Sequence, residues 1–173
     1  MKKIEMVDLK GQYEHIKEQV NQSILETIES TMFINGPGVK SFQNQLESYL
    51  GSKHVIPCAN GTDALQIALM SLGLKPGDEI ITADFTFAST VEVISLLKLT
   101  PVLVDVDPQT FNIDIPSIEK AIGPKTKAII PVHLFGQAAD MEEILALAKK
   151  NNLYVIEDNA QSLGAYYTFS DGS

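Results

Sequence analysis

A carboxylate and an amide follow the last apolar segment of the sequence, in 155-VIEDNAQS-162. Asp158 ends a segment that is predicted to be a buried strand, and Gln161 follows about one helical turn later. A buried carboxylate is costly unless it has a charged partner. A protonated ring nitrogen is such a partner, because the opposing carboxylate keeps the nitrogen charged, and Gln161 could donate a hydrogen bond to an oxygen on the same ring. The alternative is a solvated strand end with a helix cap.

The stretch 59-ANGTDAL-65 offers the groups that bind a phosphate. Gly61 lets the backbone approach a ligand closely, and the helix predicted after it presents free N–H groups and a partial positive charge. Thr62 adds a hydroxyl donor. The alternative is an ordinary turn in which Thr62 or Asp63 caps the helix, since the stretch is neither a G-x-G-x-x-G fingerprint nor a P-loop.

Two aromatic residues, Phe85 and Phe87, lie in 84-DFTFAST-90, where a predicted strand gives way to a helix. An aromatic ring at that place can stack on a flat heteroaromatic ligand; the alternative is that both side chains belong to the core. Taken together, the three motifs require a ligand with a phosphate, a flat ring and a basic ring nitrogen. Pyridoxal 5'-phosphate (PLP) has all three.

An alternation of strands and helices must position these motifs. Apolar strands separated by helical crossovers predict an α/β fold, a three-layer structure with a mostly parallel sheet covered on both faces. Ligands of such sheets bind beyond the carboxyl ends of the strands, which is where the three motifs lie. The predicted strands are 54–59, 79–83, 101–107, 126–133 and 153–158, and the predicted helices between them are 64–74, 87–99, 115–122 and 139–152.

Two further helices are predicted ahead of this alternation, at 12–31 and 39–50, with the breaker 35-NGPG-38 between them. The first has one apolar stripe, and the second is expected to turn its apolar side chains inward. The stripe consists of Ile16, Val20, Ile24 and Ile28, and the inward residues are Phe42, Leu46 and Tyr49.

Composition sets outer limits on function. The 173 residues carry a net charge of -9, and an acidic surface repels phosphate backbones, so no nucleic-acid partner is expected. The one cysteine, Cys58, has no partner for an internal disulfide, which fits a cytoplasmic protein. No signal peptide precedes the first helix, and no apolar run approaches the roughly 20 residues of a membrane span.

The sequence resembles the sugar aminotransferases of the DegT/DnrJ/EryC1/StrS family, which are PLP-dependent enzymes of fold type I. The likeness covers nearly the whole chain and implies the large domain of the aspartate aminotransferase type. It rests on stretches that include FINGPGVKSFQNQLESYLGSKHVIPCANGTDALQIAL, LKPGDEIITADFTFASTVEVI, PVLVDVDPQTFNID, KTKAIIPVHLFGQAADM and LYVIEDNAQSLGAYY.

The resemblance implies a role for each motif. Gly61 and Thr62 should hold the cofactor phosphate, Phe87 should stack on the pyridine ring, and Gln161 should contact the ring hydroxyl. Asp158, the catalytic residue of this chain, should pair with the pyridine nitrogen. No metal is implied.

Two weaker assignments follow from the same resemblance. Asn35 and Gly36 match an entrance loop near the site of a nucleotide sugar. His133, in the PVHLFG stretch, is expected to have a structural or supporting role beneath the cofactor.

The sequence departs from the family pattern at a few points. Leu99 replaces a usual glycine, and Asn159 replaces a usual alanine or cysteine, but neither change removes a cofactor contact. The Schiff-base lysine of the family lies downstream of the Asp-x-x-Gln motif, and we expect it and the C-terminal small domain in a longer protein, unless this is a truncated product. We therefore divide the chain into N-terminal helices and entrance loop, 1–50, and an incomplete PLP-binding large domain, 51–173.

The resemblance implies transfer of an amino group, with glutamate as the expected donor, to a keto sugar on a nucleotide diphosphate, for polysaccharide or amino sugar biosynthesis. The sequences of the motifs CANGTDAL and EDNAQS favour a 3-keto sugar linked to UDP or dTDP, with amination at C-4 as the alternative. The resemblance also implies a homodimer with shared sites. Two other possibilities stay open: a non-catalytic PLP-binding regulatory protein of the same fold, and an unrelated doubly wound nucleotide-binding module.

Overall fold

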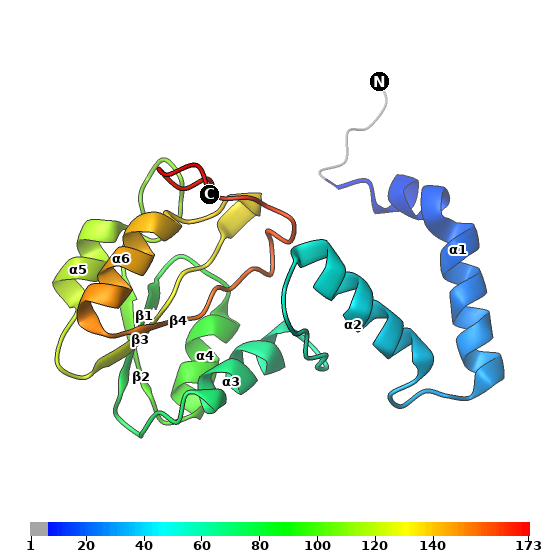
Figure 1. Cartoon of the computed structure of the whole chain (residues 1–173), viewed down its shortest axis with the longest axis horizontal. Helices are drawn as coiled ribbons and strands as arrows, with labels where there is room; N and C mark the ends of the chain where they lie inside the picture. Colours follow the sequence, from blue (N-terminus) through cyan, green and yellow to red (C-terminus); the bar gives the residue numbers. More distant parts are fainter. Residues whose placement is uncertain (1–6) are drawn as a thin grey trace. The chain divides into compact units, whose positions relative to one another are not determined.

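The computed structural model describes residues 7–173, and Figure 1 shows the elements in chain order. The described residues form two compact units that divide between Pro57 and Cys58, and each unit is described by itself. Residues 1–6, where the sequence predicts no signal peptide, lie outside the described part. Within residues 7–173, no helix combines the length and hydrophobicity needed to cross a bilayer.

The N-terminal unit holds the helices α1 (Leu9–Ser30) and α2 (Pro37–Leu50), close to the predicted ranges. Asp8 caps α1 by accepting the Gly11 N–H at 2.8 Å, and a proline opens α2, where its missing N–H costs nothing. Neither helix buries a side chain in this unit. The predicted inward packing of α2 is therefore wrong here, with Phe42 57% and Tyr49 63% exposed, because an apolar stripe is buried only when another element covers it.

The second unit contains one parallel sheet, as predicted. Its strands are β1 (Glu79–Ala83), β2 (Thr100–Val104), β3 (Thr126–Ile130) and β4 (Tyr154–Val155), in the order β2-β1-β3-β4. After β1 the chain moves outward to β2, then crosses back to β3 on the other side of β1. The winding direction therefore reverses between β1 and β3, which makes the carboxyl edge at that point the expected ligand site.

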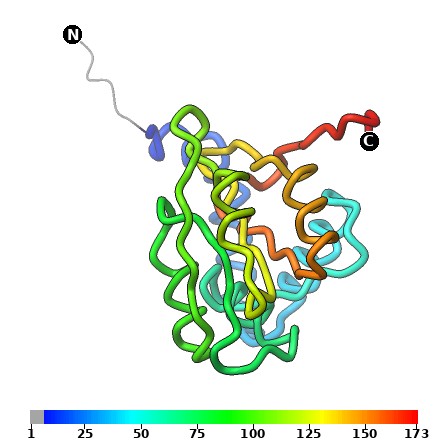
Figure 2. The backbone as a smooth tube through the Cα atoms, turned by 90° about the vertical axis from the view of Figure 1, so that its left-hand side faces the viewer, coloured from blue at the N-terminus to red at the C-terminus, as the bar shows by residue number. Residues whose placement is uncertain are grey.

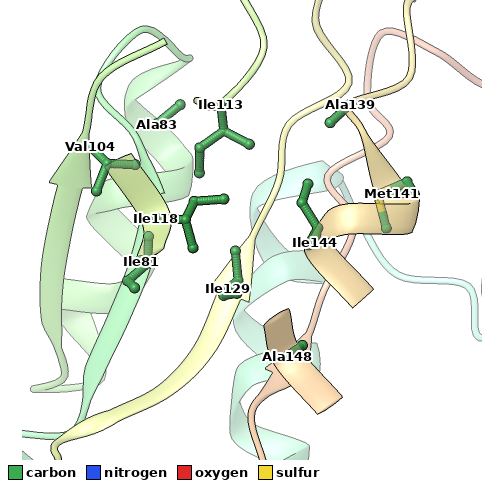
Figure 3. Close-up of a cluster of buried hydrophobic side chains, with 10 residues drawn as sticks. All are labelled: Ile81, Ala83, Val104, Ile113, Ile118, Ile129, Ala139, Met141, Ile144 and Ala148. Atoms are coloured by element: carbon green, nitrogen blue, oxygen red, sulfur yellow. The ribbon is translucent and has the colours of Figure 1, made fainter. Parts of the chain in front are cut away.

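Helices cover both faces of the sheet, which confirms the predicted three layers (Figure 1). The helices α3 (Gly61–Ser71) and α4 (Ala88–Leu96) enclose one cluster with Ile80 and Ile130. The helices α5 (Ile115–Ala121) and α6 (Met141–Asn151) enclose the other with Ile81 and Ile129, whose side chains point toward the helices in Figure 3. Alternate residues of the central strands β1 and β3 thus belong to opposite cores.

The helices before and after β1 both begin at the carboxyl edge. The helix α3 leads by a short connection into the amino end of β1, and four residues separate the carboxyl end of β1 from the start of α4. In parallel sheets a helix runs against its neighbouring strands, so the start of each helix lies at the edge where the strands end. The segment after Gly164, red in Figure 2, runs along the start of α6, where Tyr167 binds Asp140.

One predicted strand is wrong. Residues 54–59 (HVIPCA) are not part of any strand in the described part of the chain. A strand exists only through its hydrogen-bonded partner, and Pro57 also lacks an N–H to donate. The strand predicted over 126–133 is shorter in the structure, since β3 ends at Ile130. A short 3-10 helix, η1 (Leu134–Gly136), follows it after residues 131–133.

The double core predicts a clear difference between two apolar substitutions in the sheet. Ile129 is fully buried in β3, so Ile129→Ala should lower the free energy of unfolding by about 2–5 kcal/mol through lost contacts and a cavity. Leu103 in β2 is 50% exposed, and Leu103→Ala should cost about 1 kcal/mol or less. Urea denaturation of the two variants, followed by circular dichroism, measures both; equal losses would contradict the assignment of β3 to the core.

Candidate functional site

Asp158 is fixed by its backbone at the carboxyl edge of the sheet. Its N–H donates to the Pro131 carbonyl at 2.9 Å, and its carbonyl accepts the His133 N–H at 3.0 Å. These bonds form a parallel bridge beside Val132 that extends the pairing of β3 with β4. The residue is only 8% exposed, so the carboxylate is held in the interior directly beyond the strand ends.

The Asp158 carboxylate has two unequal oxygen atoms. Oδ2 accepts the hydroxyl of Thr90 in α4 at 2.8 Å, whereas Oδ1 accepts only the Ala160 N–H at 3.3 Å. None of the ion pairs recorded within residues 7–173 includes Asp158. A buried carboxylate without a cation is costly, and Oδ1 keeps free acceptor capacity.

The neighbouring acid, Glu157, has a different environment. Its side chain is 54% exposed and its Oε2 lies 2.9 Å from Nε2 of the buried His133. The His133 Nδ1 accepts the Ala139 N–H at 3.1 Å, which assigns the proton to Nε2 and makes His133 the donor to Glu157. This hydrogen bond lowers the pKa of Glu157, while partial burial opposes the shift.

Gln161 is tied to the loop that follows β3. Its Oε1 accepts the Phe135 N–H at 2.8 Å, so the amide nitrogen is left free to donate elsewhere. The side chain is exposed. The next residue, Ser162, donates its hydroxyl to the His133 carbonyl at 2.6 Å, so that the segment after Asp158 is anchored to the segment after β3 at two successive residues.

The start of α3 offers unpaired backbone donors. Asn60, and neither Thr62 nor Asp63 as predicted, caps the helix: its side-chain oxygen accepts the Asp63 N–H at 2.9 Å. An Asx cap satisfies one N–H of the first turn and leaves others available. A Cβ built on Gly61 would meet nothing within 4 Å, so the space over this turn is open to a ligand.

The phenylalanines of 84-DFTFAST-90 are not core residues. Phe87, at the N-cap position of α4, is 74% exposed. Phe85 is 49% exposed and packs against two other exposed rings, with centroid distances of 5.6 Å to Phe111 and 6.5 Å to Phe135. Phe111 and Phe135 both have left-handed backbones, with φ of 61° and 57°. Aromatic surface therefore surrounds the carboxyl edge.

Two threonines at this edge were missed by the sequence predictions. Thr86 has a buried hydroxyl oxygen without a partner among the described residues, and Thr90 is fully buried. A signal for Thr90 was present, since it shares the buried face of α4 with Val93 and Ile94, and a hydroxyl in an apolar helical stripe needs a polar partner.

Asn35 and Gly36 belong to the N-terminal unit and are described there alone. Asn35 has a φ of 50°, and a Cβ added to Gly36 would lie 2.2 Å from the Met32 carbonyl oxygen. The close approach of that carbonyl requires glycine at position 36, which is a steric reason for the residue within its own loop.

A family model matches most of the chain. The model of the DegT/DnrJ/EryC1/StrS aminotransferase family matches residues 14–169. The chain belongs to this family. The resemblance stated from the sequence motifs is therefore confirmed.

Of two curated relatives of this DegT/DnrJ/EryC1/StrS chain, one is named as an enzyme and the other as a regulatory protein. UDP-2-acetamido-2-deoxy-3-oxo-D-glucuronate aminotransferase from Pseudomonas aeruginosa is 49% identical over 164 residues, or 95% of this chain and 46% of that protein. Pleiotropic regulatory protein from Geobacillus stearothermophilus is also 49% identical over 164 residues, or 95% of this chain and 44% of that protein.

Solved structures of the family have the same fold. NtdA from Bacillus subtilis, crystallised with bound cofactor PMP, matches with a TM-score of 0.83 at 38% identity, over 90% of this chain and 36% of that chain. The DegT/DnrJ/EryC1/StrS chain thus has the predicted fold of the type I large domain. It spans less than half the length of each of these three proteins.

The hydrogen bond between His133 and Glu157 predicts a pH-dependent contribution to stability. Because the pKa of Glu157 is lowered in the folded state, its contribution is present above the unfolded pKa of about 4.3 and is lost as the pH falls through the lower folded pKa. The wild type should therefore melt above Glu157→Gln at pH 6, by a margin worth less than about 1 kcal/mol because the pair is solvent-screened. The margin should vanish toward pH 3.

Thermal melts of both proteins between pH 3 and pH 7 measure this difference. The matched control is Glu92→Gln, which changes an exposed acid on α4 and should give a smaller, flatter difference. A margin that grows on acidification would contradict the assigned direction.

Proposed function

We propose that the protein containing this chain is a PLP-dependent aminotransferase that acts on a keto sugar carried by a nucleotide diphosphate. One observation carries the proposal: Asp158 is buried at the carboxyl edge, with Oδ1 open and no cation beside it among the described residues. A protonated ring nitrogen would compensate that charge. Family membership supplies the reaction class.

The residues present at this edge fit PLP. The open first turn of α3, with Gly61 and Thr62, suits its phosphate. The exposed ring of Phe87 suits stacking on the pyridine, and the free amide nitrogen of Gln161 suits the ring hydroxyl. When bound, PLP supplies an electron sink that a protonated ring nitrogen deepens.

Asp158, Gln161 and the first turn of α3 have different roles in binding the cofactor. With PLP bound, Asp158 Oδ1 would accept the N–H of the ring nitrogen and hold the proton at that atom. Gln161 fixes the ring orientation through its donor, which stays directed outward because its oxygen is engaged by the Phe135 N–H. The first turn of α3 binds the phosphate dianion and keeps the cofactor in place between half-reactions.

The substrate assignment rests on the motifs and on one relative. The Pseudomonas aeruginosa relative is named for a 3-oxo sugar linked to UDP, which supports a 3-keto sugar on UDP or dTDP over a 4-keto sugar. Glutamate is the proposed amino donor. Asn35 and Gly36 are proposed to lie by the sugar nucleotide in a cytoplasmic homodimer with shared sites, in which residues 51–173 belong to the cofactor-binding domain.

A regulatory protein of the same fold is the second candidate. It is favoured by one observation, the 49% identity to a relative named as a pleiotropic regulatory protein. The two candidates share the cofactor and differ in turnover. They also differ in one residue of the complete gene product. The aminotransferase requires a lysine downstream of the Asp-x-x-Gln motif as its nucleophile, and the regulatory candidate does not.

Substitution of Asp158 tests the proposal in the complete protein. Asp158→Asn and Asp158→Ala should each lower the rate of amino transfer from glutamate by about 100-fold or more, since a removed electrostatic partner of this kind costs about 10²–10³. The control is Glu157→Gln, which changes the adjacent acid and should stay within a few-fold of the wild type.

The assay supplies PLP, glutamate and a panel of 3-keto and 4-keto sugars on UDP and dTDP, with 2-oxoglutarate as the readout. A wild type that binds PLP without turnover on any of these would favour the regulatory candidate. Unchanged turnover in Asp158→Ala would contradict the role of Asp158.

A further inference from the structure

The hydroxyl of Thr90, in the first turn of α4, bonds a side chain that is distant in the sequence. It donates to Asp158 Oδ2 at 2.8 Å, across 68 residues of sequence. Helical threonine and serine hydroxyls commonly bond a carbonyl of the preceding turn. Four others among the described residues do so: Thr27, Ser30, Ser71 and, also in α4, Ser95. Thr90 instead directs its one proton to the carboxylate.

This bond makes the two oxygens of Asp158 inequivalent. Thr90 is fully buried, so water does not replace its hydroxyl, and Oδ2 is occupied. Oδ1 has only the long contact of 3.3 Å from the Ala160 N–H. With the backbone of Asp158 fixed on both sides by Pro131 and His133, the remaining freedom is rotation of the carboxylate, and the Thr90 hydroxyl removes it.

The same turn of α4 carries a second contact surface. Phe87 stands at the N-cap and Thr90 three residues on, and the Thr90 N–H donates to the Phe87 carbonyl at 3.2 Å. Positions three apart lie on neighbouring parts of one helical face. The first turn of α4 therefore fixes the position of Phe87 relative to the Asp158 carboxylate that Thr90 binds.

We propose that Thr90 is a positioning residue that occupies Asp158 Oδ2 and so presents Oδ1 to the ring nitrogen of the cofactor. The inference rests on the proposed function. Thr90 itself touches no reacting atom. It acts by holding Asp158 in one rotamer and by donating to the charged carboxylate, which a side chain of the same shape without a hydroxyl cannot do.

The experiment compares three variants of the complete protein loaded with PLP. Thr90→Val removes the hydroxyl and keeps the shape, and Thr90→Ser restores the hydroxyl. The matched control is Thr82→Val: Thr82 is also fully buried in the same unit, but its hydroxyl donates to the Ile130 carbonyl at 2.9 Å. The readouts are the dissociation constant of PLP by absorbance titration and the ¹⁵N chemical shift of the pyridine nitrogen in labelled PLP.

Thr90→Val should weaken PLP binding by about tenfold, the size of one hydrogen bond to a charged group, and should move the ¹⁵N shift toward that of a neutral pyridine. Thr90→Ser should return both readouts to the wild-type values. Thr82→Val should lose stability and leave the ¹⁵N shift unchanged. If Thr90→Val does not fold, Thr90→Ala provides the same comparison.

Two results would overturn the inference, and they are distinguishable. In a wild type that binds PLP, equal dissociation constants and equal ¹⁵N shifts for Thr90→Val and Thr82→Val would remove the role of Thr90 and leave the proposed function intact. A wild type that does not bind PLP would contradict the proposed function, and the role of Thr90 with it.

Discussion

The burial of one carboxylate constrains the carboxyl edge of this sheet. Asp158 is placed by the strand pairing that its own backbone continues. Among the described residues, its carboxylate then receives the Thr90 hydroxyl at Oδ2 and a long bond from the Ala160 N–H at Oδ1, and no cation. The cost of leaving a charge in such a place is large compared with the stability of a small domain. The segments around it are correspondingly well anchored, with His133, Gln161 and Ser162 linking the loops that follow β3 and Asp158.

The winding of the sheet determines which segments reach this carboxylate. Because the chain reverses direction between β1 and β3, the connections that leave these two strands diverge to opposite faces and open the edge between them. The connection after β1 delivers the start of α4, with Phe87 and Thr90, while the connection after β3 delivers His133 and Phe135. Residues from distant parts of the sequence are thus assembled by topology, with no local motif required.

The fold was largely predictable because its signals are periodic and local. The strand 79–83 was placed at its observed bounds, and the helices between strands were all found. The predictions that failed depend on partners that a sequence pattern does not identify. HVIPCA has strand-like residues but pairs with no strand among residues 7–173, and Phe42 and Tyr49 have no covering element in their own unit. Asn60 was overlooked as a cap because Thr62 and Asp63, close by in the sequence, are residue types that can also cap a helix. The bond between Thr90 and Asp158 spans 68 residues, so only the packing of α4 on the sheet reveals it.

The left-handed backbones of Phe111 and Phe135 set a limit on how this edge can change in evolution. Such conformations cost of order 1–3 kcal/mol for residues with a Cβ, and here the surrounding hydrogen bonds, among them those from Asn112 to the Gln137 and Ala138 carbonyls, hold them in place. Glycine at either position would relieve the backbone and delete an aromatic ring from the rim. A substitution that relaxes the backbone at either position therefore also removes part of the aromatic rim.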